Sequence, residues 1–252
     1  MLSKNQIKFI RSLQMKKFRE IHHQFMAEGT KLVLDLLESS VPVKMIFATD
    51  EWIREHAGKI RAVPVPVTLE ELSRITALAT APPVLALFGV PEPGLTPDAL
   101  KSDLVLVLDE IHDPGNLGTI LRIADWFGIR QIVCSENTVD LYNPKVVQAT
   151  MGSIARISVL YTNIADWLSK IPEGIPVYGT SLDGENIYSQ KLTRNGAIII
   201  GSESSGISRE ARLFITNKLL IPSFSDGAHA ESLNASVATA IVCSEFRRMN
   251  AV

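Results

Sequence analysis

The chain has 252 residues, which is enough for two domains of ordinary size. Hydrophobic residues make up 46% and charged residues 21%, as in a globular protein with a full core, and no apolar run approaches the roughly 20 residues that span a bilayer. The net charge of −2 does not by itself indicate a nucleic-acid binder. Early charges, without a hydrophobic leader segment, favour a cytoplasmic location.

The first 25 residues carry a local excess of positive charge. Their only acid is Glu20, and two histidines, His22 and His23, stand beside it. The basic residues are Lys4, Lys8, Arg11, Lys16, Lys17 and Arg19. Such a patch binds phosphates whatever the net charge of the chain, and it is equally typical of a solvated helix face. Both interpretations stay open at this stage.

The pattern over residues 1–92 predicts a small α/β domain. We expect helices over 4–13, 31–38, 52–57 and 69–75, and strands over 25–27, 43–48, 63–67 and 84–90. Gly29 closes the first strand, and Thr30 is the expected cap of the helix over 31–38. Pro91-Glu92-Pro93-Gly94 and Pro97 then indicate a linker, which we place at 93–102.

Residues 103–252 show a longer and more regular alternation. Strands are expected over 104–108, 131–134, 156–160, 176–179, 197–200 and 218–221, and helices over 118–127, 144–151, 164–170, 209–215 and 235–249. Continuous apolar runs such as LVLVL and AIII predict strands covered on both faces, as in a parallel sheet. Cys134 and Cys243 lack the spacing of a zinc site, so we expect reduced core thiols and no metal.

Three unusual loops follow strands of this second domain. The first, after Leu108, leads through Asn116 into a helix that carries Arg122, and an arginine on a core-facing helix needs a carboxylate or a ligand as partner. The second places Glu203 between Gly201 and Gly206, without the Lys of a nucleotide-triphosphate loop or the spacing of a dinucleotide-binding motif.

The third loop follows the run Leu219-Leu220-Ile221 and ends at Ser232-Leu233-Asn234, where a helix begins. Loops that leave the carboxyl ends of parallel strands converge on one crevice. We therefore expect the polar residues of the three loops to share a site, although they span a long stretch of sequence.

The three loops resemble, in order and spacing, the three motifs of the SpoU (TrmH-type) RNA 2′-O-ribose methyltransferases of the SPOUT superfamily. The resemblance covers about residues 103–249, through DPGNLGTILRIADWFG, GSESSG and IP…SLNASVATAI. The preceding part resembles the substrate-binding domain often fused to these enzymes, on KFRE…FMAEGTKLVLDLL and APPVLALF. That domain is similar to ribosomal proteins that bind kinked RNA.

The resemblance implies a trefoil-knotted α/β fold, S-adenosylmethionine held in the knot, and a homodimer whose active site is completed across the interface. The implied catalytic and RNA-positioning residues are Asn116, Arg122, Glu203, Ser232 and Asn234. The implied cofactor contacts are Thr180 and Ser181, in a loop before the glycine motif, with Gly201, Ile221 and Leu233. The loop from Pro222 to Ser232 departs from the family, because it is longer and has Ser223-Phe224-Ser225 in place of Met-x-Gly; Ala235 stands where Val is common.

Methyl transfer to a ribose hydroxyl needs in-line alignment and a route for the proton. The family assigns the base role to the arginine that matches Arg122. A guanidinium ordinarily offers no acceptor, so Arg122 either gives up its proton in this site or stabilises developing negative charge. His112 and His229 are alternative bases outside the motif positions. A Ser232–His229–Asp226 hydrolase triad is disfavoured, because the chain has no G-x-S-x-G motif.

The leading prediction is S-adenosylmethionine-dependent methylation of a ribose 2′-OH in structured RNA, with ribosomal RNA favoured because an extra domain can grip a folded element. A transfer-RNA 2′-O-methyltransferase, an antibiotic-resistance role at a ribosomal site, and a non-catalytic RNA-binding or ribosome-assembly factor are the alternatives. All five catalytic positions carry the expected residue types, which argues against loss of catalysis.

Overall fold

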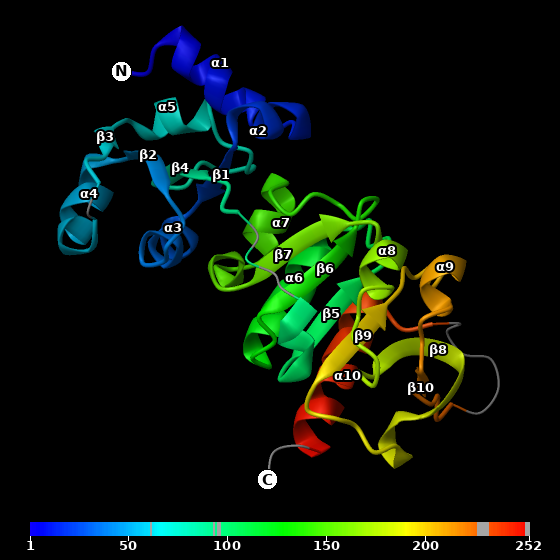
Figure 1. The fold of residues 1–252 in the computed structure, drawn as a ribbon. Helices are drawn as coiled ribbons and strands as arrows, with labels where there is room; N and C mark the ends of the chain where they lie inside the picture. The colour runs from blue at the N-terminus through cyan, green and yellow to red at the C-terminus, as the bar shows by residue number, and fades with distance from the viewer. Residues whose placement is uncertain (61, 93, 95–96, 226–231, 250–252) are drawn as a thin grey trace. The chain divides into compact units, whose positions relative to one another are not determined.

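The computed structural model describes the whole chain except residues 61, 93, 95–96, 226–231 and 250–252 (Figure 1). The chain forms two compact units. The first unit comprises Met1–Glu92 and Asp140–Arg156, and the second comprises Pro93–Val139 and Ile157–Val252. The sequence had suggested a division at residues 93–102 alone, so the membership of Asp140–Arg156 in the first unit is a feature that it did not predict.

The first unit is built on a four-stranded sheet with the order β1-β4-β2-β3. Its strands are β1 (Gln24–Glu28), β2 (Val43–Ala48), β3 (Val65–Pro66) and β4 (Val84–Gly89). Its helices are α1 (Lys4–Ser12), α2 (Lys16–His22), α3 (Thr30–Leu37), α4 (Asp50–His56), α5 (Leu69–Ser73) and α7 (Pro144–Ala149), with short 3₁₀ turns at Ala57–Lys59 and Ser153–Ala155. Every residue of β4 is buried, because this strand pairs antiparallel with β1 and β2 on its two sides.

In the first unit one local prediction needs correction and one helix was missed. The cap of α3 is Gly29, and Thr30 makes a different contact: its hydroxyl accepts a hydrogen bond from the indole nitrogen of Trp52 at 2.9 Å. The helix α2 was not predicted, because its seven residues show no clear apolar period. The capping box at Ser3 and Gln6, in contrast, starts α1 where the pattern placed it.

The second unit is built on a six-stranded sheet with the order β10-β8-β9-β5-β6-β7, in which every pairing is parallel. Its strands are β5 (Leu104–Leu108), β6 (Gln131–Ser135), β7 (Ser158–Thr162), β8 (Val177–Asn186), β9 (Gly196–Ile200) and β10 (Asn217–Leu220). Its helices are α6 (Pro114–Trp126), α8 (Ile164–Leu168), α9 (Arg209–Arg212) and α10 (Ala235–Met249), with 3₁₀ turns at Pro97–Lys101 and Ile187–Ser189. All residues of β5 and β9 are buried, which confirms the predicted parallel sheet.

Helix α6 and strand β8 of the second unit extend well beyond their predicted bounds. Helix α6 begins at Pro114 instead of residue 118, because the Asp113 carboxylate accepts the backbone N–H of Asn116 at 2.8 Å and Pro114 has the backbone angle of a first helical residue. Strand β8 continues to Asn186, far beyond residue 179, because its second half pairs with Leu219 and Leu220 of β10.

Both cysteines are buried free thiols, as predicted. Burial raises the pKa of Cys243 to about 12 and raises the pKa of Cys134 as well, so neither is poised for reaction. Among the described residues, each helix is too short or too polar to cross a bilayer.

Candidate active site

The first two motif loops leave neighbouring strands at the same edge of the sheet. Leu108, the last residue of β5, pairs with Ile200, the last residue of β9. Asp109 then ties the loops together, because its backbone N–H donates to the Ile200 carbonyl at 2.9 Å and its carboxylate accepts the N–H of Ser208 at 2.8 Å. Asp109 is buried, so its carboxylate has a structural role in this arrangement.

Gly201 opens the second loop at a point where only glycine fits. A Cβ on Gly201 would lie 2.2 Å from the carbonyl carbon of Gly206, because the loop turns back on itself. Ser202 and Gly206 exchange two backbone hydrogen bonds, of 3.2 and 2.9 Å. This tight turn carries Glu203 on its outer side, where its side chain is exposed.

Glu203 is the centre of a polar network that joins all three loops. Its Oε1 accepts from Asn116 Nδ2 at 2.5 Å, from Asn234 Nδ2 at 3.3 Å and from the backbone N–H of Ala235 at 3.2 Å. Asn234 Nδ2 also donates to Asn116 Oδ1 at 2.9 Å. The predicted meeting of Asn116, Glu203 and Asn234 is therefore present, although Asn116 and Asn234 are 118 positions apart.

The same network caps helix α10. Asn234 Oδ1 accepts the backbone N–H groups of Ser236 at 3.0 Å and Val237 at 3.3 Å. The Glu203 carboxylate lies at this helix N-terminus, where unpaired N–H groups and the helix dipole favour negative charge. Each group of the network is thus oriented by backbone geometry and not by side-chain contacts alone.

Helices α6 and α10 pack against each other and are tied at both ends. At their N-termini Asn116 bonds Asn234. At the far end the Arg247 guanidinium donates to the carbonyl oxygens of Phe127 at 2.7 Å and Gly128 at 3.2 Å.

A cavity of about 550 Å³ opens beside the network, within the usual range for small-molecule sites. Seven predicted residues line it: Thr180, Ser181, Gly201, Glu203, Ile221, Ser232 and Leu233. Thr180 and Ser181 lie within strand β8 and not in a loop, which corrects their predicted setting. Leu219, Leu220 and Ala238 add an apolar wall that the motifs did not indicate.

Asp183 also lines the cavity and was missed by the sequence analysis. A hydrogen bond from Lys218 Nζ, of 2.6 Å, and a second one from the Ser181 hydroxyl lower the pKa of Asp183 to about 2. The cavity wall therefore carries an ionised carboxylate besides Glu203. No motif signalled Asp183, because it lies in the part of β8 that the sequence pattern did not predict.

Arg122 is the predicted residue that does not join this cluster. It is exposed on α6 and is absent from the cavity lining. The alternative of a salt bridge is not realised: within the described residues Arg122 has neither a hydrogen bond nor an ion pair. His112 is exposed as well, and His229 and Asp226 lie outside the described residues.

The basic residues of the first unit divide into two groups. Lys4, Lys8, Arg11, Lys16 and Lys17 are exposed on α1 and α2. Arg19 is only 4% exposed and forms an ion pair with Asp140, so it has no free surface to offer a phosphate. We therefore remove Arg19 from the predicted RNA-contacting set.

The fold and site define a class: a parallel α/β protein with an adenosyl-sized cavity at a sheet edge and an Asn–Glu–Asn network beside it. Residues 103–244 match the model of the SpoU rRNA Methylase family, and residues 4–86 match the MRM3-like substrate binding domain. The chain belongs to the SpoU rRNA methylase family.

Several relatives match along nearly the whole chain. The 23S rRNA (guanosine(2553)-2′-O)-methyltransferase RlmP of Bacillus subtilis is 31% identical over 97% of both chains. A structure from Porphyromonas gingivalis assigned to the TrmH family of RNA methyltransferases is 40% identical over 98% of this chain and 99% of that chain, with a TM-score of 0.86. The AdoMet-bound rRNA methyltransferase from Sinorhizobium meliloti is 30% identical over 98% of this chain and 96% of that chain, also with a TM-score of 0.86.

Proposed function

We propose that this protein methylates a ribose 2′-OH of ribosomal RNA in the cytoplasm, with S-adenosylmethionine as the methyl donor. The observation that carries the proposal is the Asn116–Glu203–Asn234 network at the mouth of a cavity of adenosyl size. Relatives that match over the whole length, such as RlmP, support ribosomal RNA as the substrate class.

The cavity has the chemistry that S-adenosylmethionine requires. Ile221, Leu220 and Leu233 provide an apolar wall for an adenine ring, and Thr180 and Ser181 provide hydroxyl groups for the polar part. Glu203 places a carboxylate at the cavity, and the Asp183 carboxylate, which also lines it, is paired with Lys218. When bound, the cofactor supplies a methyl group on a positively charged sulfur, and the Glu203 carboxylate complements that charge.

The network holds the RNA in place in this proposal. Asn116 and Asn234 present amide groups whose geometry is set by two helix N-termini, and Ser232 adds a hydroxyl at the cavity. These groups align the ribose oxygen with the methyl carbon for an in-line displacement. Alignment of this kind is worth roughly 7–11 kcal/mol in well-held reactions.

We propose that Arg122 acts in the cavity of a second copy of the chain, so that the working enzyme is a homodimer. Arg122 is exposed on α6, away from the cavity of its own chain. The helices that carry the network also expose apolar side chains that a partner would cover, with Trp126 85% and Val237 47% exposed. A guanidinium delivered this way donates hydrogen bonds to the developing alkoxide and to phosphate oxygens.

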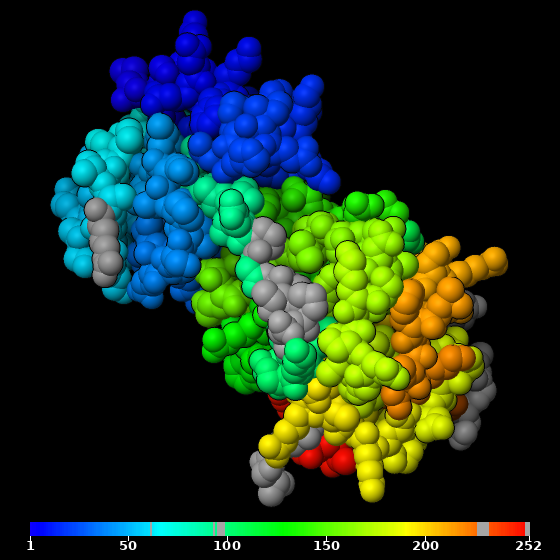
Figure 2. Space-filling view, in the orientation of Figure 1, coloured from blue at the N-terminus to red at the C-terminus, as the bar shows by residue number. Residues whose placement is uncertain are grey.

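The first unit is proposed to grip the RNA. Its exposed lysines and arginine, on α1 and α2, provide positive charge that tracks a phosphate backbone. These two helices form an open part of the surface (blue in Figure 2). In this proposal the second unit binds the cofactor and catalyses the methyl transfer.

The test is methyl transfer from tritiated S-adenosylmethionine to RNA from cells that lack the gene. Transfer into ribosomal RNA at one 2′-O-position, lost in Glu203→Gln and kept in the control Glu173→Gln at an exposed position of the same unit, supports the proposal. Transfer into transfer RNA alone would make the protein a transfer-RNA methyltransferase. RNA binding without any transfer would favour the non-catalytic assembly factor.

A further inference from the structure

The segment Asp140–Arg156 lies within the sequence matched by the methylase model but belongs to the first compact unit. Its helix α7 packs against strand β1. The ring of Tyr142 lies 4.7 Å from the ring of Phe25, a buried residue of β1. Gly152 sits directly against Asp35 of α3, since a Cβ there would lie 2.1 Å from the Asp35 carboxylate. The segment is therefore an integral part of the unit that carries the basic residues.

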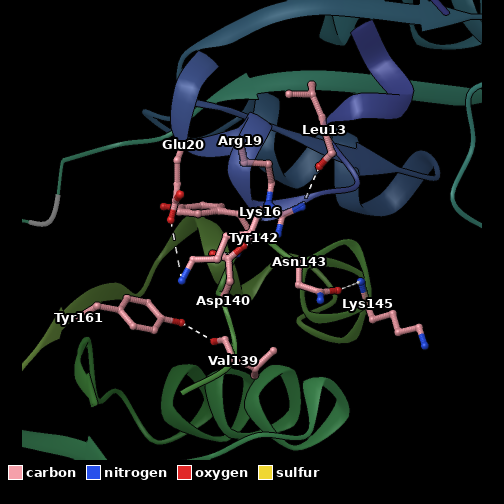
Figure 3. Close-up of polar contacts among 10 residues, drawn as sticks. All are labelled: Leu13, Lys16, Arg19, Glu20, Val139, Asp140, Tyr142, Asn143, Lys145 and Tyr161. Carbon is pink, nitrogen blue, oxygen red and sulfur yellow. Dashed lines mark hydrogen bonds and ion pairs between the residues drawn. The ribbon is translucent and has the colours of Figure 1, made fainter. Parts of the chain in front are cut away.

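Arg19 makes the polar connection between this segment and the basic helices (Figure 3). Its Nε donates to Asp140 Oδ2 at 2.9 Å, and its Nη2 forms an ion pair with the same oxygen. Its Nη1 donates to the carbonyl oxygen of Leu13 at 2.8 Å, and Leu13 is the residue that ends α1. Asp140 in turn accepts the backbone N–H of Tyr142 at 3.2 Å through its other oxygen.

One guanidinium thus joins the end of α1, the middle of α2 and the segment that begins at Asp140. The two helices also touch through aromatic rings, because His22 of α2 lies 5.0 Å edge-on from Phe9 of α1. Arg19 and this ring contact therefore both restrain the angle between α1 and α2. All the exposed cations of the predicted RNA-contacting set stand on these two helices.

We propose that Arg19 and Asp140 are positioning residues for RNA binding: their ion pair holds α1 and α2 at the angle at which the exposed cations of these helices contact successive phosphates together. The inference rests on the proposed function of the first unit. Neither residue touches RNA, because Arg19 is buried and the Asp140 carboxylate is occupied by Arg19 and Tyr142. A change in the pair should therefore reduce the number of simultaneous phosphate contacts without removing any cation from the surface.

The experiment compares Arg19→Lys and Asp140→Asn with the control Arg54→Lys, an arginine exposed on α4 of the same unit. Binding of ribosomal RNA is measured across a series of salt concentrations, alongside KM and kcat for methyl transfer and the Kd for S-adenosylmethionine. We expect RNA affinity to fall about tenfold at low salt. We also expect the slope of log K against log salt to become shallower, by the amount that corresponds to the loss of about one phosphate contact or more. We expect kcat at saturating RNA and the cofactor Kd to match the control.

A second measurement distinguishes a positioning role of Arg19 from a general loss of stability in the variants. The double substitution Lys16→Gln with Lys17→Gln is made in the natural chain and in Arg19→Lys. If Arg19 positions these lysines, their loss weakens RNA binding less in the Arg19→Lys background than in the natural chain, and the two effects are not additive. A merely structural role would leave them additive at temperatures where both variants are folded.

Unchanged affinity and an unchanged salt slope in folded Arg19→Lys and Asp140→Asn would overturn the inference. A fall in kcat at constant KM would also overturn it, because the pair would then act on the methyl-transfer site. If the natural protein binds cofactor but neither binds nor methylates RNA, the proposed function fails first. A protein that methylates RNA with variants equal to the control refutes only the positioning role.

Discussion

The two units use polar contacts in opposite ways. In the first unit the pair that joins distant segments consists of the buried Arg19 and the half-buried Asp140, and its donors and acceptors are used within the fold. In the second unit the Asn116–Glu203–Asn234 network joins equally distant segments but stays open beside a cavity. Breaking a buried ion pair lowers the free energy of unfolding strongly, because it leaves a desolvated charge without a partner. Breaking a solvent-exposed polar contact changes the free energy of unfolding little, and exposed polar groups can bind a ligand. The contrast separates residues that shape the protein from residues that meet its ligands.

The largest expected effect on folding comes from Asp140→Ala, which leaves the buried Arg19 charge without its carboxylate. We expect the free energy of unfolding to fall by about 3–5 kcal/mol, as for other broken buried pairs. Urea unfolding of the whole chain, followed by circular dichroism and by the fluorescence of its three tryptophans, measures it. A loss under about 1 kcal/mol, the range of surface pairs, would mean that this pair resembles an exposed one.

The next effect is on activity. Arg122→Ala should reduce methyl transfer about 10²–10³-fold, the usual result of removing one group that stabilises transition-state charge, while cofactor binding and stability stay near those of the natural protein. Near-normal turnover would remove Arg122 from the mechanism.

Mixing subunits decides where Arg122 acts. Heterodimers of Arg122→Ala with Glu203→Gln contain one complete site if the arginine is delivered to the partner, so mixing two inactive proteins should restore about a quarter of the natural rate. No recovery, in a mixture shown to exchange subunits, would place Arg122 in the site of its own chain.

Gly152→Ala tests the packing of the Asp140–Arg156 segment. Gly152 has a φ of +97°, and a Cβ would collide with the Asp35 carboxylate. We expect a loss of about 1–3 kcal/mol in stability from backbone strain and the clash. Asp35→Ala in the same chain should recover the part that is due to the clash. Full stability of Gly152→Ala alone would show that the segment is loosely packed.

Asn116→Ala should affect methyl transfer strongly and stability little, whereas Asp140→Ala should affect stability strongly. The Asn116 amide bonds two side chains at an open site, so we expect a change of only about 0.5–1.5 kcal/mol in unfolding free energy but a large loss of methyl transfer. Thermal unfolding and transfer assays on the same sample measure both. Strong destabilisation of Asn116→Ala with activity retained would show that this network serves the stability of the fold and not methyl transfer.

The smallest effect concerns pH. Burial raises the pKa of Glu28, and hydrogen bonds from Thr76 and Ala77 only partly oppose this. A raised folded-state pKa means that the stability contributed by Glu28 is full below its unfolded pKa and is lost as the pH rises through the folded value. The stability of the natural protein relative to Glu28→Gln should therefore decrease as the pH rises from the ordinary Glu pKa of 4.5 towards neutral pH. A constant difference across that range would contradict the raised pKa.

The sequence alone determined most of the parallel strands of the second unit and the centre of its site. Apolar runs such as Leu104–Leu108 and the turn residues after them predict buried parallel strands, and parallel strands bring their following loops to one edge. Asn116, Glu203 and Asn234 were therefore predictable as neighbours, because their position depends on local motifs and strand direction.

Only the tertiary structure decided the contacts that depend on packing between distant, locally unremarkable segments. Nothing around Arg19 distinguishes it from Lys17, and its burial follows from Asp140, 121 positions away. Asp183 lies at the cavity in the half of β8 that forms only because it pairs with β10. The segment Asp140–Arg156 belongs to the first unit because Gly152 packs against Asp35 and Tyr142 packs against Phe25. Periodicity and turn chemistry act over a few residues, whereas the partner of a buried charge is selected by the whole fold.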